Sequence, residues 1–425
     1  MVPRLLLDLT PLRISPPYRR MWAGSSLSGV GTALTTVAVG LQVYELTGST
    51  LSVGLVGLFA FVPLVVLGLY GGSIVDAHDR RTVIMITAAG LALVAAGFAI
   101  QAWLDLGDVG VLYGLVAVQN GLFGVSSPAR TSIIPRLLPA QLLPAANALS
   151  SLSFGVSMTI GPLLAGGLVA GLGYGWTYSI ELVLLLVAFW TVFALPPLPP
   201  EGTPRRAGLG SVLEGLRFLG TRPNVRMTFV IDLCAMVLAM PRVLFPAIGA
   251  ALLGGGATTV GILVAGIAAG AVLAGLFSGP LGHIHRQGVA IVVSVVVWAV
   301  SVTAFGVVVA LSPGPLSGGG ANWTLVPATL CMVLAGSADA VSSVFRTTIL
   351  QSATPDALRG RLQGIFIVVV AGGPRLGDLL LGAIAEISGE ALAAIAGGVV
   401  CALAVTVLAA LNRGFLRYDA RSPTP

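Results

Sequence analysis

The sequence predicts an all-α polytopic membrane protein with twelve transmembrane helices in two pseudo-symmetric six-helix bundles. Of its 425 residues, 56% are hydrophobic and only 9% are charged, whereas a soluble domain carries about 25% charged residues. Several uncharged runs reach the ~20 residues that one helix needs to cross the hydrocarbon core. The 22 basic residues are all arginines, and they gather in alternate connections between the apolar runs.

Each predicted span is an apolar run bounded by charges or by turn residues. Two boundaries depend on turn residues alone, because the glycines of 171–175 and the Pro-Gly-rich stretch 313–320 interrupt long uncharged runs. The predicted spans are residues 21–45, 51–73, 82–104, 109–127, 145–170, 176–195, 227–252, 258–281, 288–311, 323–344, 362–385 and 391–411.

The arginines predict the orientation of these spans. All but two of them fall in connections on one side, and the opposite connections carry only acids, at Asp105, Asp108, Glu386 and Glu390. Under the positive-inside rule this pattern places both termini in the cytoplasm and makes the number of spans even. The arginines are spread over several connections rather than forming one basic stripe, so we expect no nucleic-acid binding.

The halves are separated by a proline-rich stop over 196–204, followed by an expected amphipathic helix on the inner membrane surface. Ser211 and Glu214 have the spacing of a capping box, and apolar residues recur at helical spacing over 209–219. The predicted domains are an N-terminal bundle over 1–195, a cytoplasmic linker over 196–226 and a C-terminal bundle over 227–425.

The two halves contain a repeated motif. Ser126-Ser127-x-x-Arg130-Thr131 reappears 216 residues later as Ser342-Ser343-x-x-Arg346-Thr347, at the equivalent ends of spans four and ten. Internal repeats of this kind are typical of secondary transporters, whose substrate site lies between the repeats near the middle of the membrane.

The connection between spans two and three reads Gly72-x-x-x-Asp76-x-x-x-Arg80-Arg81. Glycine allows two helices to approach closely, and Asp76 can accept hydrogen bonds at the end of a span. The two arginines can pair with acids or with lipid phosphates. The simpler interpretation is a short charged turn that only holds the topology.

This connection resembles the cytoplasmic gating motif of the major facilitator superfamily, although Ala77 and Asp79 depart from it. The stretches 44–49 and 128–149 resemble the branch of transmembrane secretion effectors and enterobactin exporters. The resemblance implies the major facilitator fold, with spans one, four, seven and ten around a central cavity. It also implies a cytoplasmic gate formed by Gly72, Asp76, Arg80, Arg81, Arg130 and Arg346.

Span five contains Gly161-Pro162-x-x-Ala165-Gly166-Gly167. Proline removes a backbone hydrogen bond and small residues allow close helix packing, so we expect a bend at Gly161 and Pro162. The segment is similar to the antiporter motif of superfamily exporters, which implies export rather than uptake. Ordinary small-residue packing is the alternative.

Charged residues inside the spans are the candidates for function, because each costs at least about 2.5 kcal/mol at the bilayer centre. The candidates for substrate binding or proton coupling are Asp232, Arg242, Asp339, Arg375 and Asp378. Two interpretations stay open. Either an acid carries a proton while an arginine stabilises it or binds an anionic substrate, or Arg375 and Asp378 form a structural ion pair and Asp232 is hydrated near the cytoplasm.

Other polar residues of the spans are expected to be less central. Many proton-driven drug exporters have an arginine in span four, but here the stretch 117–121 contains Gln119 and no arginine. Proton coupling through that position is therefore not expected. Glu45 and Glu181 lie near span ends, and we expect both at the membrane interface.

The predicted function is a secondary active transporter that exports a small organic molecule, siderophore or drug-like, by alternating access in exchange for protons. No phosphate-binding loop and no nucleophile–base constellation occurs in the sequence, so we expect no enzymatic activity and no cofactor. The expected partners are the small-molecule substrate, protons and membrane lipids, with the chain acting as a monomer. The alternatives are a proton-coupled uptake symporter of the same fold, and a lipid flippase or non-transporting membrane protein.

Overall fold

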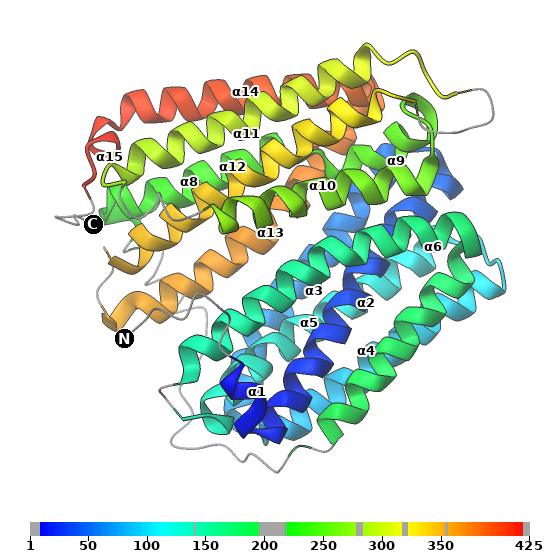
Figure 1. Cartoon of the computed structure of the whole chain (residues 1–425), viewed down its shortest axis with the longest axis vertical. Coiled ribbons are helices and arrows are strands. Elements are labelled where there is room, and N and C mark those ends of the chain that lie inside the picture. The colour runs from blue at the N-terminus through cyan, green and yellow to red at the C-terminus, as the bar shows by residue number, and fades with distance from the viewer. Residues whose placement is uncertain are drawn as a thin grey trace. The chain divides into compact units, whose positions relative to one another are not determined.

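The computed structural model describes residues 9–139, 142–193, 195, 217, 219–277, 284–316, 322–352 and 356–419. Within these ranges every regular element is helical (Figure 1). The elements are α1 (Thr10–Ile14), α2 (Pro16–Thr47), α3 (Thr50–Ala77), α4 (Arg80–Trp103), α5 (Val109–Leu137), α6 (Leu143–Phe193), α8 (Pro223–Leu238), a 3-10 helix (Pro241–Leu244), α9 (Phe245–Ala247), a π-helical turn (Ile248–Leu252), α10 (Gly256–Leu276), α11 (Gln287–Ala310), α12 (Leu325–Ser352), α13 (Asp356–Ser388), α14 (Glu390–Leu411) and α15 (Arg413–Leu416).

The helices reproduce the twelve predicted spans. Among the described residues, ten helical segments are long and apolar enough to cross a membrane, and one of them covers Leu149–Phe193. That segment contains Gly173 at φ 77° and ψ 178°, a conformation that glycine adopts without strain. Gly173 therefore divides α6 into two arms, which confirms the predicted boundary at 171–175. The remaining predicted span, 362–385, lies within α13.

Large apolar side chains are exposed along these helices. Leu93 is 74% exposed and Trp190 73%, and Leu330 and Leu403 are exposed by 62% and 61%. Exposed apolar surface on this scale is unfavourable in water and favourable against lipid tails. The helices therefore belong to a multi-pass membrane protein.

The chain divides into two compact units, and each is described by itself. The first comprises Met1–Gln42 with Phe59–Gly208, and the second Val43–Leu58 with Leu209–Pro425. The predicted domain boundaries at 195 and 227 stay a prediction, and most of the expected amphipathic linker helix lies outside the described residues. The short segment 43–58, which joins the ends of α2 and α3, belongs to the second unit.

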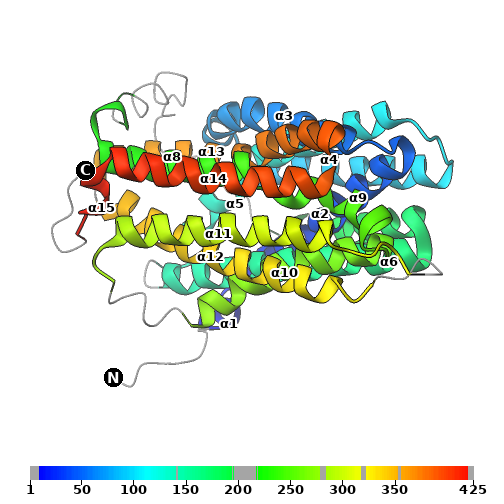
Figure 2. The same ribbon diagram turned by 90° about the horizontal axis from the view of Figure 1, so that it is seen from above.

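In the first unit, α4 packs against α5 and α6. Its interior contains Tyr18, Phe98 and Tyr178, each fully buried. In the second unit, α11 packs against both α12 and α14, α10 packs against α12, and α8 packs against α13. Figure 2 shows α11 and α14 running alongside each other over most of their length.

The seventh predicted span, 227–252, is present but interrupted. Helix α8 ends at Leu238, and Ala239 (φ −135°, ψ 32°) and Met240 (φ −92°, ψ 101°) leave the helical region. Pro241 follows directly, and proline has no backbone N–H to continue the hydrogen-bond ladder. A 3-10 helix, α9 and a π-helical turn complete the span. Discontinuous helices of this kind place backbone and side-chain groups around binding sites in transporters.

Helices α5 and α12 run past the predicted ends of spans four and ten, to Leu137 and Ser352. Their repeated Ser-Ser-x-x-Arg motifs lower the hydropathy, but the helical hydrogen bonding continues through them. Arg130 and Arg346 therefore lie inside helices. Arg346 is 3% exposed, so it is buried at a position where the hydropathy pattern predicts a connection.

Candidate transport site

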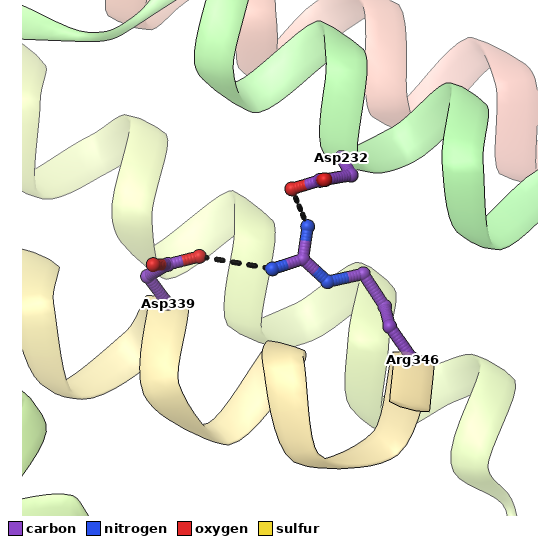
Figure 3. A network of polar contacts seen from close by, with 3 residues as sticks. All are labelled: Asp232, Asp339 and Arg346. Carbon is purple, nitrogen blue, oxygen red and sulfur yellow. Dashed lines mark hydrogen bonds and ion pairs between the residues drawn. The ribbon is translucent and has the colours of Figure 1, made fainter. Parts of the chain in front are cut away.

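Arg346 of α12 connects two of the predicted site acids (Figure 3). Its guanidinium is paired with the carboxylate of Asp232 on α8, and both side chains are buried. A second nitrogen, Nη2, donates to Asp339 Oδ1 at 3.1 Å, and the Asp339 side chain is 36% exposed. The interpretation of Asp232 as a hydrated residue is therefore wrong. An arginine predicted for the gate thus contacts two acids predicted for the site.

The repeated motif in the first unit has different partners. Arg130 donates from Nε to Ser126 Oγ at 3.1 Å and from Nη1 to Ser25 Oγ at 2.9 Å. Among the described residues it forms no ion pair with a carboxylate. The arginine of the repeated motif thus donates to two neutral hydroxyls in the first unit and contacts two carboxylates in the second.

Arg242 follows the interruption between α8 and the 3-10 helix, and its side chain is exposed. Among the described residues it forms no ion pair within 4.0 Å. Its charge nevertheless interacts electrostatically with those of Asp378, Arg375 and Asp339. The break in the helix thus places the Arg242 guanidinium, which no described carboxylate pairs with, near two acids and one arginine.

Asp378 and Arg375 lie three residues apart on α13, yet the structure contains no ion pair between them within 4.0 Å. Their charges interact only at longer range. Asp378 Oδ1 is buried and has no hydrogen-bond partner. A buried oxygen without a donor is unfavourable, so the proposed structural ion pair does not account for Asp378.

Glycines bring α13 into close contact with α8 next to the helix break. A Cβ atom on Gly377 would overlap the carbonyl oxygen of Met236, and one on Gly373 would lie 3.0 Å from Met236 Cβ. These two glycines flank Arg375 in the sequence. The close packing therefore fixes the position of Arg375 and Asp378 along the axis of α13 relative to the end of α8.

The opposite side of α13 is equally crowded by the beginning of α3, within the same compact unit. A Cβ on Gly54 would lie 2.6 Å from the carbonyl oxygen of Asp378, and one on Gly57 would lie 3.4 Å from Asp378 Oδ2. Asp378 thus lies close to the backbone of α3 on this side.

The predicted gate around the connection of α3 and α4 is described in part. Gly72 and Asp76 lie in α3, and the Asp76 side chain is outside the described part of the structure. Arg80 begins α4 and is half-buried. Asp79 caps this helix by accepting from the backbone N–H of Arg81 at 2.8 Å, which gives a physical reason for its departure from the family motif.

Arg81 ties this turn to the end of α6. Its Nη2 donates to the carbonyl oxygen of Phe193 at 2.8 Å. Its guanidinium carbon also lies 5.9 Å from the centre of the Phe193 ring, within the range of a cation–π contact. In this structure the described partner of Arg81 therefore belongs to its own unit.

Gly161 and Pro162 lie in the first arm of α6, which packs on α2. A Cβ on Gly161 would lie 2.5 Å from Ala33 Cβ, so this position requires glycine for close packing. The non-helical residue inside α6 is Gly173 rather than Pro162. The predicted bend at Pro162 stays a prediction for another state of the helix.

The expectation that Glu181 lies at the membrane interface is wrong. Glu181 is 0% exposed, in the second arm of α6. Its Oε2 accepts a hydrogen bond from Thr35 of α2, and its Oε1 accepts from Gln119 Nε2 of α5 at 3.0 Å. Both partners are distant from Glu181 in sequence, so the sequence around Glu181 gave no signal of this contact.

A second polar cluster lies one helical turn away from Glu181. The amides of Gln42 and Gln101 exchange hydrogen bonds at 3.2 and 3.0 Å, and Tyr178 donates to Gln42 Oε1 at 2.8 Å. All three side chains are buried. Three helices of the first unit, α2, α4 and α6, are joined through this cluster.

Comparisons with known proteins agree with this architecture. The family model described as transmembrane secretion effector matches residues 7–422. An enterobactin exporter of Escherichia coli is 30% identical over 417 residues, which are 96% of this chain and 95% of that protein. An enterobactin exporter of Citrobacter koseri is 29% identical over 425 residues, 99% of this chain and 97% of the other.

Solved structures share the fold at low identity. A nucleoside transporter matches with a TM-score of 0.71 and 14% identity, covering 92% of this chain and 99% of that one. The D-xylose-proton symporter matches with a TM-score of 0.69 and 14% identity, covering 92% and 96%. The chain is thus a multi-pass inner-membrane transporter of a small molecule rather than an enzyme, and it belongs to the transmembrane secretion effector family of the major facilitator superfamily.

Proposed function

We propose that the protein exports a small organic molecule from the cytoplasm by alternating access, in exchange for protons. The relatives named enterobactin exporters cover the chain over nearly its whole length. That similarity supports export, and it makes a siderophore or a drug-like molecule of similar size the first substrate to test. The observation that carries the proposal is the helix break that exposes Arg242.

Arg242 has the chemistry to bind an acidic group of the substrate. It is exposed, it lies at a discontinuous helix, and among the described residues no carboxylate occupies its guanidinium at ion-pair distance. A planar guanidinium offers five N–H donors to carboxylate or phenolate oxygens. Asp378 and Asp339 are close enough to influence it electrostatically, so substrate binding and charge balance at this place are coupled.

The remaining candidate residues have supporting roles in this proposal. Arg346 holds Asp232 and Asp339, and thereby joins α8 to α12 in the second bundle. The cytoplasmic gate is formed by Gly72, Asp76, Arg80, Arg81, Arg130 and Arg346, and Gly161 with Pro162 lets α6 bend as the bundles rock. The chain acts as a monomer, surrounded by membrane lipids.

We further propose two bundles over 1–195 and 227–425, with both termini and the linker 196–226 in the cytoplasm. Labelling of single cysteines in intact cells tests this orientation, after Cys234, Cys331 and Cys401 have been replaced. An impermeant thiol reagent should label Gly318→Cys and should not label Arg205→Cys. The reverse pattern would contradict the orientation.

The transport proposal is tested in inverted membrane vesicles with enterobactin as the probe. A pH gradient, acidic inside the vesicle, should drive accumulation by the wild type. Arg242→Gln should raise the KM at least tenfold, Arg242→Lys should raise it less, and Arg286→Gln, an exposed arginine before α11, should match the wild type. Accumulation that needs the opposite gradient would support uptake by symport, and normal efflux by Arg242→Gln and Asp378→Asn would support a flippase or a scaffold.

A further inference from the structure

The first compact unit contains a buried acid for which the proposed transport cycle has so far no role. Glu181 is fully buried in the second arm of α6. Its two carboxyl oxygens are held separately, Oε2 by the hydroxyl of Thr35 and Oε1 by the amide of Gln119. The three residues come from α6, α2 and α5, so the carboxyl lies where three helices of one unit meet.

Every described partner of Glu181 is electrically neutral. Among the residues that the structure describes, no arginine lies within ion-pair distance of this carboxyl. Asp232, the buried acid of the second unit, is by contrast matched by Arg346. A buried carboxylate without a cation is strongly unfavourable in a medium of low polarity, so Glu181 achieves neutrality by holding a proton.

The hydrogen-bond partners fit a protonated acid. The Gln119 amide donates to Oε1, the oxygen that then remains a carbonyl. A hydroxyl both donates and accepts, so Thr35 can accept from a protonated Oε2. Glutamine at position 119 thus satisfies one carboxyl oxygen without bringing a charge.

The other groups that face Glu181 from the packed helices carry no charge. Gly31 of α2 approaches so closely that a Cβ there would lie 3.3 Å from Glu181 Cγ. The titratable group that interacts with Glu181 electrostatically is Tyr178 of the same helix, and its hydroxyl donates to Gln42. Gln101 of α4 belongs to the same polar cluster and exchanges hydrogen bonds with Gln42. Each of these neighbours is neutral as well.

We propose that Glu181 is the proton-binding group of the exchange cycle, and that Thr35 and Gln119 position its carboxyl. The inference rests on the proposed export in exchange for protons. In the state described here the O–H bond is intact. When α2 or α5 moves away from α6, water replaces Thr35 and Gln119, the O–H bond breaks, and the proton passes to water while the carboxylate keeps the electron pair.

Infrared difference spectra of the reconstituted protein test the proposal without any substrate. Spectra at acid minus alkaline pH should contain the carbonyl band of a neutral carboxylic acid in the wild type. This band should be lost in Glu181→Gln and retained in Glu45→Gln, which makes the same change at an exposed glutamate. An unchanged band in Glu181→Gln would overturn the assignment.

A second variant keeps the test decisive if Glu181→Gln does not fold. Gln119→Leu removes the donor to Oε1 but leaves the acid, so the carbonyl band should move to higher frequency. A band that does not move would show that it comes from another acid.

Transport measurements separate this proposal from the proposed function. In proteoliposomes with enterobactin on both sides, Glu181→Gln should exchange it at a rate close to that of the wild type, yet lose accumulation driven by a pH gradient. Accumulation at the wild-type level would overturn the role of Glu181. If the wild type itself does not move enterobactin, the proposed function fails for this substrate, while the infrared band still decides whether Glu181 binds the proton.

Discussion

Arg346 and Asp232 form an ion pair between α12 and α8 in which both side chains are almost completely buried. Asp339, which precedes Arg346 in α12, contacts the same guanidinium, but it is partly exposed. The three charged groups differ in their exposure to solvent, which can stabilise a charge that has lost its partner. The consequences of neutralising them should therefore differ as well.

Neutralising Asp232 should destabilise the protein more than neutralising Asp339. Asp232→Asn leaves the charge of Arg346 buried with one partner instead of two, and breaking a buried pair costs about 3–5 kcal/mol. Asp339→Asn removes a partly hydrated partner, for which about 1 kcal/mol or less is expected. Thermal unfolding of the purified protein in detergent measures both changes, and equal effects of the two variants would contradict this account.

A double variant separates the lost attraction from the stranded charge. Asp232→Asn combined with Arg346→Gln removes both charges, so it should be more stable than Asp232→Asn alone. The same unfolding measurement applies. If the double variant is less stable than either single variant, the arginine has stabilising contacts other than the two acids.

Substitution of Gly377 should disturb the packing of α13 on α8. A Cβ there overlaps the carbonyl oxygen of Met236, and a backbone atom cannot move aside as a flexible side chain can. Gly377→Ala is expected to cost about 1–3 kcal/mol by overpacking and to slow transport, because Arg375 and Asp378 shift with the helix. Gly114→Ala is the matched control, since a Cβ at Gly114 meets no atom within 4 Å. A Tm of Gly377→Ala equal to that of the wild type would contradict this account, because it would show that the two helices separate freely.

Much of the fold follows from the sequence because its strongest signals are local. Runs of apolar residues identify the spans, and the glycines of 171–175 identify the division of α6 at Gly173. The hydropathy pattern predicts ends of α5 and α12 that are too early, because serines and an arginine interrupt the hydropathy but not the backbone hydrogen bonds. The break after α8 had a local signal in Pro241 that an average over the whole span conceals.

The candidate site could be predicted only in part, because its partners are distant in sequence. Charge inside a span identified Asp232 and Asp339, but their position relative to Arg346 depends on how α8 packs beside α12. The position of Glu181 early in its span predicts a place at the membrane interface. Its burial results from contacts with Thr35 and Gln119, which come from two other helices, and no local pattern contains that information.

The amide pair of Gln42 and Gln101 should be sensitive to the loss of one member. Each side chain is buried and supplies both a donor and an acceptor to the other. Gln101→Leu leaves the Gln42 amide partly unsatisfied, at a cost of about 1–3 kcal/mol. Replacing both glutamines by leucine should recover part of the Tm, and a double variant as unstable as the sum of the singles would contradict a direct coupling.

Removal of the Glu386 carboxylate should loosen the start of α3. Glu386 Oε2 accepts from Ser49 Oγ at 2.9 Å and from the backbone N–H of Leu51 at 3.4 Å, within the second compact unit. A negative charge at a helix N-terminus stabilises it by about 0.3–1 kcal/mol, so Glu386→Ala should speed amide hydrogen exchange over 49–54 by about two- to fivefold. Glu45 is an exposed acid on α2, and Glu45→Ala should leave this exchange unchanged. Equal exchange rates in the wild type and Glu386→Ala would mean that Ser49 caps the helix alone, since its Oγ accepts from the N–H of Ser52 at 3.2 Å.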